Sequence, residues 1–380
     1  MSPMLIDDTD ALKVLHVAET VRSGIATYFN ELHPHQRASY GRDRVHYVIP
    51  SDHRDDLVGF DDAEISTFKR DKRGVSGLLQ MAIVACQQIN RLRPDVIHIH
   101  STFAGLIMRP LLFMMRGKPK IVYCPHGWAF GRETSRLSHR VAKLIERVLS
   151  KFTDHIICIS RYEQQEAIDA GIAPHRLTLV PNGISVDRPV LQSSPVEWQT
   201  SKTKVLFIGR LDRQKGYDLL IDMARRLESV VDVRILGSSV VGKPVELDLP
   251  GNVTLMGWAD RPQIERHLDA TDLVIIPSRW EAFGLVALEA MRSAKPIVAF
   301  NIGALPEIVE DGVTGVLSDP VSADSLVEAV LRAINLNLSA AGQKGFERFK
   351  RLYDVKMTHR LLDEVYFSGT DAALREAACQ

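Results

Sequence analysis

Residues 275–291 read IIPSRWEAFGLVALEAM, and this stretch decides the fold class. It begins inside a short apolar, β-branched run over 272–278 that predicts a buried strand closed by Pro277. Beyond Gly284, apolar residues recur at the spacing of a helix, and Pro296 stops that helix from continuing. A buried strand followed by a loop and an amphipathic helix is the repeating unit of a parallel α/β sheet.

Two glutamates of this stretch are the first candidate functional residues. Glu281 falls on the loop at the carboxyl end of the strand, whereas Glu289 falls inside the helix. Ligands of open α/β sheets bind at that loop, and the free amides of a helix N-terminus attract anions. A diphosphate over Phe283, Gly284 and Leu285 would leave one carboxylate to bind hydroxyl groups on each side of it. The alternative is a solvated helix that carries two glutamates.

A similar strand, loop and helix lie upstream. The run 204–208 predicts a strand that ends in Gly209, and a helix is predicted over about 217–228. Arg210 and Lys215 lie on the connecting loop, where a guanidinium and an ammonium suit a pyrophosphate and the charge of a departing nucleotide. Two solvated bases are the alternative. A cation near a helix N-terminus is unfavourable, however, unless an anion shares the site.

The first half of the chain carries weaker signals. The segment Ser23-Gly24 follows an apolar run and starts a helix pattern, so its amides could approach phosphates. His126, in the sequence CPHGW, follows the run 120–124 and is expected to project from the carboxyl end of that strand. Structural packing is the alternative role for such a histidine. No G-x-G-x-x-G motif is present, which argues against NAD.

These motifs resemble those of the GT-B fold, family 4 retaining glycosyltransferases, of the bacterial exopolysaccharide or lipopolysaccharide type. The stretch GRLDRQKG at 209–216 is similar to the family element G-R-L-x-x-x-K-G, and the glutamates are similar to the family pair. The resemblance implies that Glu281 binds the transferred sugar and Glu289 the ribose of the donor. It also implies that Arg210 and Lys215 stabilise the departing diphosphate.

The resemblance extends to the first half of the chain, with one departure. It places His126 beside the transferred sugar, whereas Ser23 stands where family members often carry a glycine. The expected catalytic residues are Glu281, His126, Arg210 and Lys215. The expected donor-binding residues are Gly24, Gly209, Arg210, Lys215, Phe283, Gly284, Leu285 and Glu289. The resemblance implies neither a metal nor a cofactor.

Two sets of apolar runs predict two sheets. Those of the first half lie at 13–17, 45–49, 95–100, 120–124, 155–159 and 177–180, and those of the second at 204–208, 232–236, 253–256, 272–276, 296–300 and 314–317. Helix patterns separate most of them, so we expect an α/β protein with two doubly wound Rossmann-like domains, which by resemblance face a cleft. The expected boundaries are an acceptor-side domain at 1–185, a linker at 186–202, a nucleotide-sugar domain at 203–350, and a C-terminal helix at 351–380 that crosses back to the first domain.

Composition restricts the compartment and the partners. The 47 basic and 47 acidic residues of this 380-residue chain balance, so no global field recruits nucleic acid. Four cysteines without paired spacing favour a reducing compartment, and the N-terminus has acids where a signal peptide needs bases. No apolar run reaches the length of a membrane span. We therefore expect a cytoplasmic protein, either free or on the inner face of the cytoplasmic membrane.

A basic segment raises the question of membrane contact. Residues 101–151 hold ten Lys or Arg against two acids, and within 132–152 apolar residues form one helical face and bases the other. A helix packed on the core by its apolar face is the default interpretation. The sharper hypothesis is peripheral docking on anionic phospholipid, with Lys69, Arg70, Lys72 and Arg73 contributing.

His98 and His100 alternate along one predicted strand and therefore point to the same face. They could form part of a metal site, but no third ligand stands at a suitable spacing in the sequence. Packing is the preferred interpretation.

The resemblance therefore implies a retaining, metal-independent hexosyltransferase, and no cofactor is expected. Its expected partners are a nucleotide-sugar donor, UDP-linked in preference to GDP-linked, and a glycan or lipid-linked glycan acceptor of cell-envelope or exopolysaccharide biosynthesis. The alternatives are a GT-B enzyme that is not a transferase, such as a nucleotide-sugar epimerase, and a catalytically silent nucleotide-sugar-binding protein.

Overall fold

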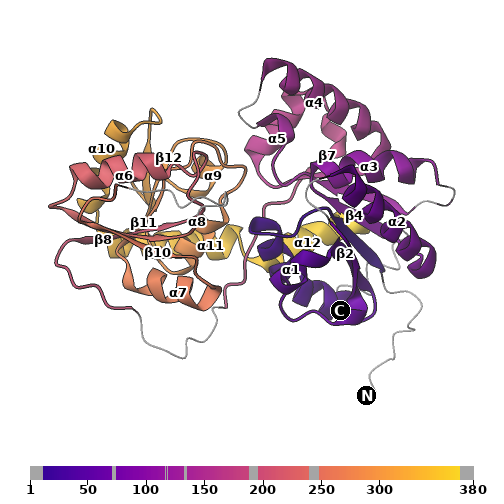
Figure 1. Ribbon diagram of the computed structural model, residues 1–380, viewed down its shortest axis with the longest axis horizontal. Helices are drawn as coiled ribbons and strands as arrows, with labels where there is room; N and C mark the ends of the chain where they lie inside the picture. The colour runs from indigo at the N-terminus through magenta and orange to yellow at the C-terminus, as the bar shows by residue number, and fades with distance from the viewer. Residues whose placement is uncertain are drawn as a thin grey trace. The chain divides into compact units, whose positions relative to one another are not determined.

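The computed structural model describes residues 12–70, 74–115, 117, 119–131, 135–187, 196–238 and 248–368. The contacts divide the chain into two compact units (Figure 1). Unit 1 comprises Met1–Gly183 and Val355–Gln380, and unit 2 comprises Ile184–Asp354. Each unit contains one parallel sheet with helices on both faces, as a doubly wound α/β fold requires.

Unit 1 is built on a seven-stranded sheet in the order β3-β2-β1-β4-β5-β6-β7. The strand order reverses between β1 and β4, which pair in parallel with His16 opposite His98. The strands are β1 (Val14–Ala18), β2 (Val45–Pro50), β3 (Ile65–Phe68), β4 (Val96–His100), β5 (Lys120–Cys124), β6 (His155–Cys158) and β7 (Leu177–Leu179).

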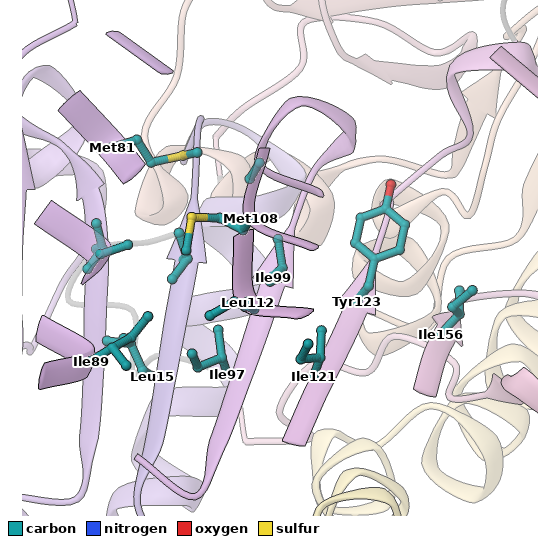
Figure 2. Close-up of a cluster of buried hydrophobic side chains, with 14 of the residues drawn as sticks. Leu15, Met81, Ile89, Ile97, Ile99, Met108, Leu112, Ile121, Tyr123 and Ile156 are labelled. Atoms are coloured by element: carbon teal, nitrogen blue, oxygen red, sulfur yellow. The ribbon is translucent and has the colours of Figure 1, made fainter. Parts of the chain in front are cut away.

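Six helices of the described residues belong to this unit. They are α1 (Gly24–Tyr40), α2 (Val75–Leu92), α3 (Thr102–Phe113), α4 (Arg136–Leu149), α5 (Arg161–Asp169) and α12 (Val355–Tyr366), with short 3-10 turns at 51–56, 62–64, 129–131, 150–152 and 174–176. The main core of unit 1 lies between the strands and the helices α2, α3 and α5 (Figure 2). In it Met81 of α2 and Met108 of α3 pack with Ile97 and Ile99 of β4. The alternate residues of β4, His98 and His100, therefore point to the opposite face, where α1 and α12 pack on each other.

Unit 2 repeats the architecture with six strands in the order β10-β9-β8-β11-β12-β13. The strands are β8 (Thr203–Ile208), β9 (Val231–Leu236), β10 (Val253–Gly257), β11 (Leu273–Ile276), β12 (Ile297–Phe300) and β13 (Gly315–Ser318). The helices are α6 (Tyr217–Arg226), α7 (Arg261–Ala270), α8 (Leu285–Arg292), α9 (Leu305–Ile308), α10 (Ala323–Ile334) and α11 (Leu338–Leu352). The core of unit 2 fills the space between the sheet and the helices α6 and α10.

The expected α/β class and two parallel sheets are confirmed, with two differences in the elements. Strand β3 was not expected, because Ile65–Phe68 is a short edge strand with Ser and Thr between its apolar residues. The expected C-terminal helix at 351–380 appears as α12, which begins at Val355 because the chain leaves the preceding helix α11 at Tyr353-Asp354. Across the described residues, no helix has the length and apolarity that a membrane span needs.

Candidate functional site

The loops of unit 2 that carry the expected donor site lie side by side. Strands β8 and β11 are paired neighbours, although β9 and β10 come between them in the sequence. The strand order therefore reverses at this pair, which is where open α/β sheets bind ligands. The loop after β8 carries Arg210 and Lys215, and the loop after β11 carries Glu281. Sheet order thus brings together the two motifs that the sequence places 66 residues apart.

A direct ion pair joins the two loops. Lys215 Nζ lies 2.6 Å from Glu281 Oε2, and the two side chains are only 20% and 12% exposed. Ser278 Oγ donates to the same carboxylate oxygen at 3.2 Å. A short contact between two partly buried charged groups is stronger than a contact between the same charges on the surface. The pair fixes the Glu281 carboxylate at the carboxyl edge of the sheet.

Arg279, which the sequence analysis did not single out, reinforces the junction. Its guanidinium donates to both carboxylate oxygens of Asp218 at 2.7 Å each, and to the carbonyl of Arg213 at 2.8 Å. Its own backbone amide donates to the carbonyl of Gln214 at 2.8 Å. This bidentate contact lowers the pKa of Asp218 through the hydrogen bonds and charge of Arg279. An arginine two residues before Glu281 was the only signal available in the sequence.

Arg210 does not contact Glu281 in the way that Lys215 does. Its guanidinium bonds Gln214 Oε1 at 2.7 Å and lies 3.2 Å from Asp212 Oδ2, with 44% of its side chain exposed. Asp212 also accepts from the Lys215 backbone amide at 2.9 Å, so it organises both bases of the loop. The exposed guanidinium can exchange these partners for an anion at low cost.

Two glycines allow the backbone to approach the candidate site closely. A Cβ on Gly216 would lie 1.8 Å from the Pro277 carbonyl oxygen, and a Cβ on Gly303 would lie 2.1 Å from the Glu281 carbonyl oxygen. Both glycines also have positive φ, 69° and 54°. Ala304 donates its amide to the same Glu281 carbonyl at 3.2 Å. The loop after β12 therefore holds the backbone of Glu281, while the ion pair with Lys215 holds its side chain.

The start of α8 has the geometry expected of an anion-binding helix terminus. Gly284 precedes the helix with φ 103°, which turns the chain so that Leu285 begins it. The Phe283 side chain is buried and packs edge-on against Tyr353, so only its backbone can meet a ligand. Glu289 is half-buried, on the fifth residue of α8. Helix amides at such a terminus favour negative charge.

Gly209 directly follows β8, and Trp258 directly follows β10. A Cβ on Gly237, after β9, would lie 1.8 Å from the Gly209 carbonyl, so the loops after β8 and β9 pass in contact. Trp258, after β10, is 74% exposed, whereas a strand-end tryptophan packed in the core would be buried. An exposed indole at this edge is available to stack on a planar ring.

In unit 1 the carboxyl edge of the sheet is marked by unusual backbone. Ser23, Ser101 and His126 follow β1, β4 and β5 and have φ of 51°, 78° and 52°. Ser23 thus adopts a conformation for which glycine is the usual residue, and Gly24 begins α1 directly after it. Positive φ at non-glycine residues costs free energy and often accompanies functional sites.

Glu163, also missed by the sequence analysis, holds the turn that contains His126. Its buried carboxylate accepts from the backbone amides of Gly127 and Ile159, both at 2.7 Å, and its carbonyl accepts from Trp128 Nε1 at 2.9 Å. Burial raises the pKa of Glu163 to about 8, although the two amide hydrogen bonds favour the ionised form. Its sequence signal, a glutamate in the first turn of α5, is indistinguishable from an ordinary capping residue.

A third histidine lies beside His98 and His100, although none stands at a suitable spacing in the sequence. His16 of β1 faces them across the sheet, and one ring nitrogen of each lies within 4.8 Å of the others, close enough for a metal ion. His16 Nδ1 and His100 Nε2, however, lie 2.9 Å apart and satisfy each other by hydrogen bonding. His98 Nδ1 contacts the Tyr366 hydroxyl at 2.6 Å. Packing and hydrogen bonding therefore account for most of this cluster without a metal.

The default interpretation of the basic helix is wrong in one respect. Of the apolar residues of α4, Ala142 and Leu149 pack inward, whereas five are exposed by 38–72%, namely Leu137, Val141, Leu144, Ile145 and Val148. The inward side of α4 instead carries Glu146, which pairs with the buried Arg109 at 2.8 Å. The four bases of α4 form a second stripe beside the apolar one (Arg136, Arg140, Lys143 and Arg147).

Three other bases of this region are buried or partly buried. Arg109 is fully buried over the Tyr123 ring, Lys120 donates to the carbonyl of Tyr366 at 2.7 Å, and Arg70 contacts Glu19. Lys72, Arg73, Arg116, Lys118 and Arg132 lie outside the described residues. Helix α3 contacts α4, and helix α2 contacts α3. Both carry further exposed large apolar side chains: Val75, Leu79, Ile83, Phe103, Leu106 and Phe113.

Two families match consecutive halves of the chain. Residues 22–188 match the family described as Glycosyltransferase Family 4, and residues 192–348 match the family described as Glycosyl transferases group 1. A Klebsiella pneumoniae protein described as an uncharacterised 41.2 kDa protein in the cps region is 35% identical over 328 residues, which are 83% of this chain and 88% of that one.

Two more distant proteins are similar over most of their length. The Escherichia coli UDP-Gal:alpha-D-GlcNAc-diphosphoundecaprenol alpha-1,3-galactosyltransferase is 24% identical over 69% of this chain and 74% of its own. The crystal structure of Anabaena HepE in complex with UDP and glucose superposes with a TM-score of 0.74 at 22% identity, over 94% of this chain and 100% of that one. At that identity, the structural likeness establishes the fold alone.

Proposed function

The chain belongs to the family 4 glycosyltransferases of the GT-B fold, and we propose that it is a retaining hexosyltransferase that uses a nucleotide-diphosphate sugar. The observation that carries this proposal is the Lys215–Glu281 ion pair, which joins the loops after β8 and β11 where the strand order reverses. A cation and a carboxylate held together at this edge can bind opposite ends of a sugar diphosphate. The pair also keeps each charge compensated before the donor arrives.

The proposed roles follow from the chemistry of each side chain. Lys215 and Arg210 bind the diphosphate and stabilise its charge as it departs. The amides of Gly284 and Leu285 add the positive end of α8. Glu281 accepts hydrogen bonds from hydroxyls of the transferred sugar, and Glu289 from those of the ribose. His126 is the proposed sugar contact of unit 1.

The reaction we propose needs no protein nucleophile. The bond between the anomeric carbon and the diphosphate oxygen breaks, and the acceptor oxygen bonds to that carbon on the same face. An oxygen of the departing diphosphate takes the acceptor proton. Because Arg210 and Lys215 supply the positive charge that a metal would otherwise supply, turnover is expected to persist in EDTA. Retention is checked by the anomer of the sugar first formed from an α-linked donor.

The relatives suggest the donor and the acceptor. One relative is named for UDP-galactose and a diphosphoundecaprenol-linked acceptor, one structure contains UDP and glucose, and one relative belongs to a cps region. We therefore favour a UDP-sugar and a glycan or lipid-linked glycan of capsule or exopolysaccharide biosynthesis. A cavity of about 220 Å³ at the carboxyl edge of the unit 1 sheet, lined mainly by apolar groups such as Phe68, Val75, Leu78 and Phe103, suits the apolar part of such an acceptor.

Donor turnover tests the proposed activity. The purified protein is incubated with UDP-, GDP- and ADP-sugars, and released nucleoside diphosphate is measured. We expect release from one UDP-sugar, and a loss of at least 100-fold in Glu281→Ala, because that carboxylate acts on the transferred sugar. Glu328→Ala is the matched control, since Glu328 is an exposed glutamate on α10 of the same unit.

The alternatives predict other outcomes of the same assay. A nucleotide-sugar epimerase converts the donor without releasing one nucleoside diphosphate for each donor molecule converted. A silent nucleotide-sugar-binding protein binds UDP and turns over no donor, even after glycan and lipid-linked acceptors are added. Either outcome contradicts the proposed transferase.

We also propose that unit 1 docks on anionic phospholipid through α4. The exposed apolar stripe of α4 beside its four bases is typical of a helix that lies in a membrane interface. The apolar side chains would enter the acyl boundary, and the bases would meet lipid phosphates. The exposed apolar residues of α2 and α3 extend the same kind of surface. This location would give the enzyme direct access to a lipid-linked acceptor.

Liposome flotation tests this docking. We expect the protein to float with vesicles that contain phosphatidylglycerol and to dissociate in high salt. Leu144→Glu should abolish flotation without loss of stability, because Leu144 is 61% exposed. Leu331→Glu is the control, an exposed leucine on helix α10 of unit 2. Flotation that is indifferent to lipid charge, or equal loss in both variants, would contradict docking through α4.

A further inference from the structure

Four side chains of unit 1 form one continuous row of hydrogen bonds. Gln36 Oε1 lies 2.9 Å from His16 Nε2, His16 Nδ1 lies 2.9 Å from His100 Nε2, and His100 Nδ1 lies 2.9 Å from His126 Nε2. Gln36, His16 and His100 are fully buried, on the sheet face beneath α1. His126 is partly exposed, at the carboxyl edge of the sheet. The row therefore connects the interior with the proposed sugar contact.

The three imidazoles are neutral over the physiological range. Burial lowers the pKa of His16 and of His126 to about 3, and burial together with the neighbouring histidines lowers that of His100 well below its usual value. A neutral imidazole has one N–H and one nitrogen lone pair. Each contact between two rings needs one donor and one acceptor. All three rings must therefore donate in the same direction along the row.

The end of the row selects this direction. The Gln36 carbonyl oxygen can only accept, so His16 carries its proton on Nε2 and accepts on Nδ1. His100 must then carry its proton on Nε2 and accept on Nδ1, and so must His126. We propose that Gln36 fixes the tautomer of His126 through His16 and His100, so that His126 presents its Nδ1 lone pair as a hydrogen-bond acceptor.

This inference deepens the proposed function and rests on it only for the identity of the ligand. An acceptor at His126 Nδ1 suits a hydroxyl of the transferred sugar. The reverse direction would present an N–H donor there. Gln36, His16 and His100 are thus positioning residues, because only His126 would touch the sugar. His98 stands outside the row, since its Nδ1 contacts the Tyr366 hydroxyl.

Histidine ring NMR tests the direction in the full chain without donor. The protein is labelled with ¹³C,¹⁵N-histidine, and long-range ¹H–¹⁵N correlations identify the protonated nitrogen of each ring. His16, His100 and His126, each assigned by its own replacement with asparagine, are expected to be Nε2–H tautomers. Nδ1–H tautomers in these rings would overturn the inference. Because this measurement needs no activity, an inactive protein with Nε2–H rings would contradict the proposed function alone.

A variant tests the part played by Gln36. Gln36→Leu removes the acceptor and is expected to introduce a population of Nδ1–H tautomer at His126. It should also lower kcat/KM for the donor at least twofold. Tyr47→Phe is the matched control: it keeps the ring stacked on His16 and removes a buried hydroxyl that contacts His33 instead. An unchanged Nε2–H pattern at His126 in Gln36→Leu would overturn the role of Gln36. If this variant does not fold, the tautomers of the unmodified chain still decide the direction.

Discussion

Gly303 is a residue of the candidate site at which the backbone of Glu281 leaves no room for a side chain. We expect Gly303→Ala to reduce the free energy of unfolding by about 2–5 kcal/mol. Positive φ costs an alanine about 1–2 kcal/mol, and a Cβ 2.1 Å from the Glu281 carbonyl oxygen forces the backbone apart at a further cost of about 1–3 kcal/mol. Donor turnover should fall with it, because Glu281 is displaced. Chemical denaturation and the nucleotide-release assay measure the two effects.

Gly312→Ala separates the cost of positive φ from the cost of a steric clash. Gly312 also has positive φ, 72°, but a Cβ there would meet nothing within 4 Å. We expect it to lose only about 1–2 kcal/mol and to retain turnover. Equal losses in the two variants would mean that the close approach of Gly303 to Glu281 has no energetic consequence.

The sequence predicted those residues of the candidate site that lie on a loop between a recognisable strand and a recognisable helix. Lys215 and Glu281 were placed on loops at strand ends, and the structure brings them into contact. Arg279 and Glu163 could not be predicted, because their partners are backbone groups and the carboxylate of Asp218 in the first turn of α6, whose proximity depends on strand order. His16 was missed as a neighbour of His98 and His100 for the same reason, since β1 and β4 become adjacent only in the folded sheet.

At the scale of elements, α12 completes unit 1 from the far end of the chain. Its Leu362, Val365 and Tyr366 are buried, and its Asp363 accepts a hydrogen bond from Tyr40 of α1. A chain that ends at Asp354 should therefore destabilise unit 1 by several kcal/mol, since each buried side chain contributes about 1.5–3 kcal/mol. The buried Trp128 reports thermal unfolding of unit 1 in a variant without the other tryptophans.

A chain that ends at Ser368 is the control for this truncation, because it keeps every described residue of α12. It should unfold like the full chain. If the chain that ends at Asp354 also keeps the full melting temperature of unit 1, α12 does not stabilise that unit.

The orientation of α4 shows what periodicity cannot predict. An apolar stripe normally faces the core, yet here it faces outward while the buried Arg109–Glu146 pair occupies the inward side. Sequence periodicity gives the angle between the stripes but not which of them packs inward. Strand β3 was missed because an edge strand needs only one partner and tolerates polar residues. Most of the remaining strands are buried and were predicted because buried parallel strands are continuous apolar runs, whereas the edge strand β10 was predicted from an apolar run that is largely exposed.

For the whole molecule, we expect acid to unfold unit 1 before unit 2. Eight described histidines of unit 1 have a lowered pKa, against one in unit 2, His267. Those of unit 1 are His16, His33, His46, His98, His100, His126, His155 and His359. Between about pH 6.5 and pH 4 the unfolded state binds more protons at these sites. Each site therefore removes up to about 1.4 kcal/mol of stability per pH unit as the pH falls.

Buried carboxyls of unit 1 act in the opposite sense, but they are fewer. Burial raises the pKa of Glu163 to about 8 and that of Asp363 to about 6, so these groups add stability as the pH falls towards their unfolded pKa values. Single-tryptophan variants that retain Trp128 or Trp280 report the two units separately during acid titration. Unfolding of unit 2 at the higher pH, or unfolding of both units at one pH, would contradict this expectation.

The division of the chain has a consequence for its biosynthesis. Unit 2 is one uninterrupted segment, Ile184–Asp354, whereas unit 1 needs residues from both ends of the sequence. Ile184 and Asp354 form a β-bridge, so the nascent chain enters and leaves unit 2 at one place. On the ribosome, unit 2 can therefore complete its core while unit 1, synthesised first, still lacks α12. Unit 1 is thus the first unit to begin synthesis and the last to complete its fold. Until α12 is synthesised, His98 Nδ1 lacks the contact with the Tyr366 hydroxyl that it makes in the complete fold.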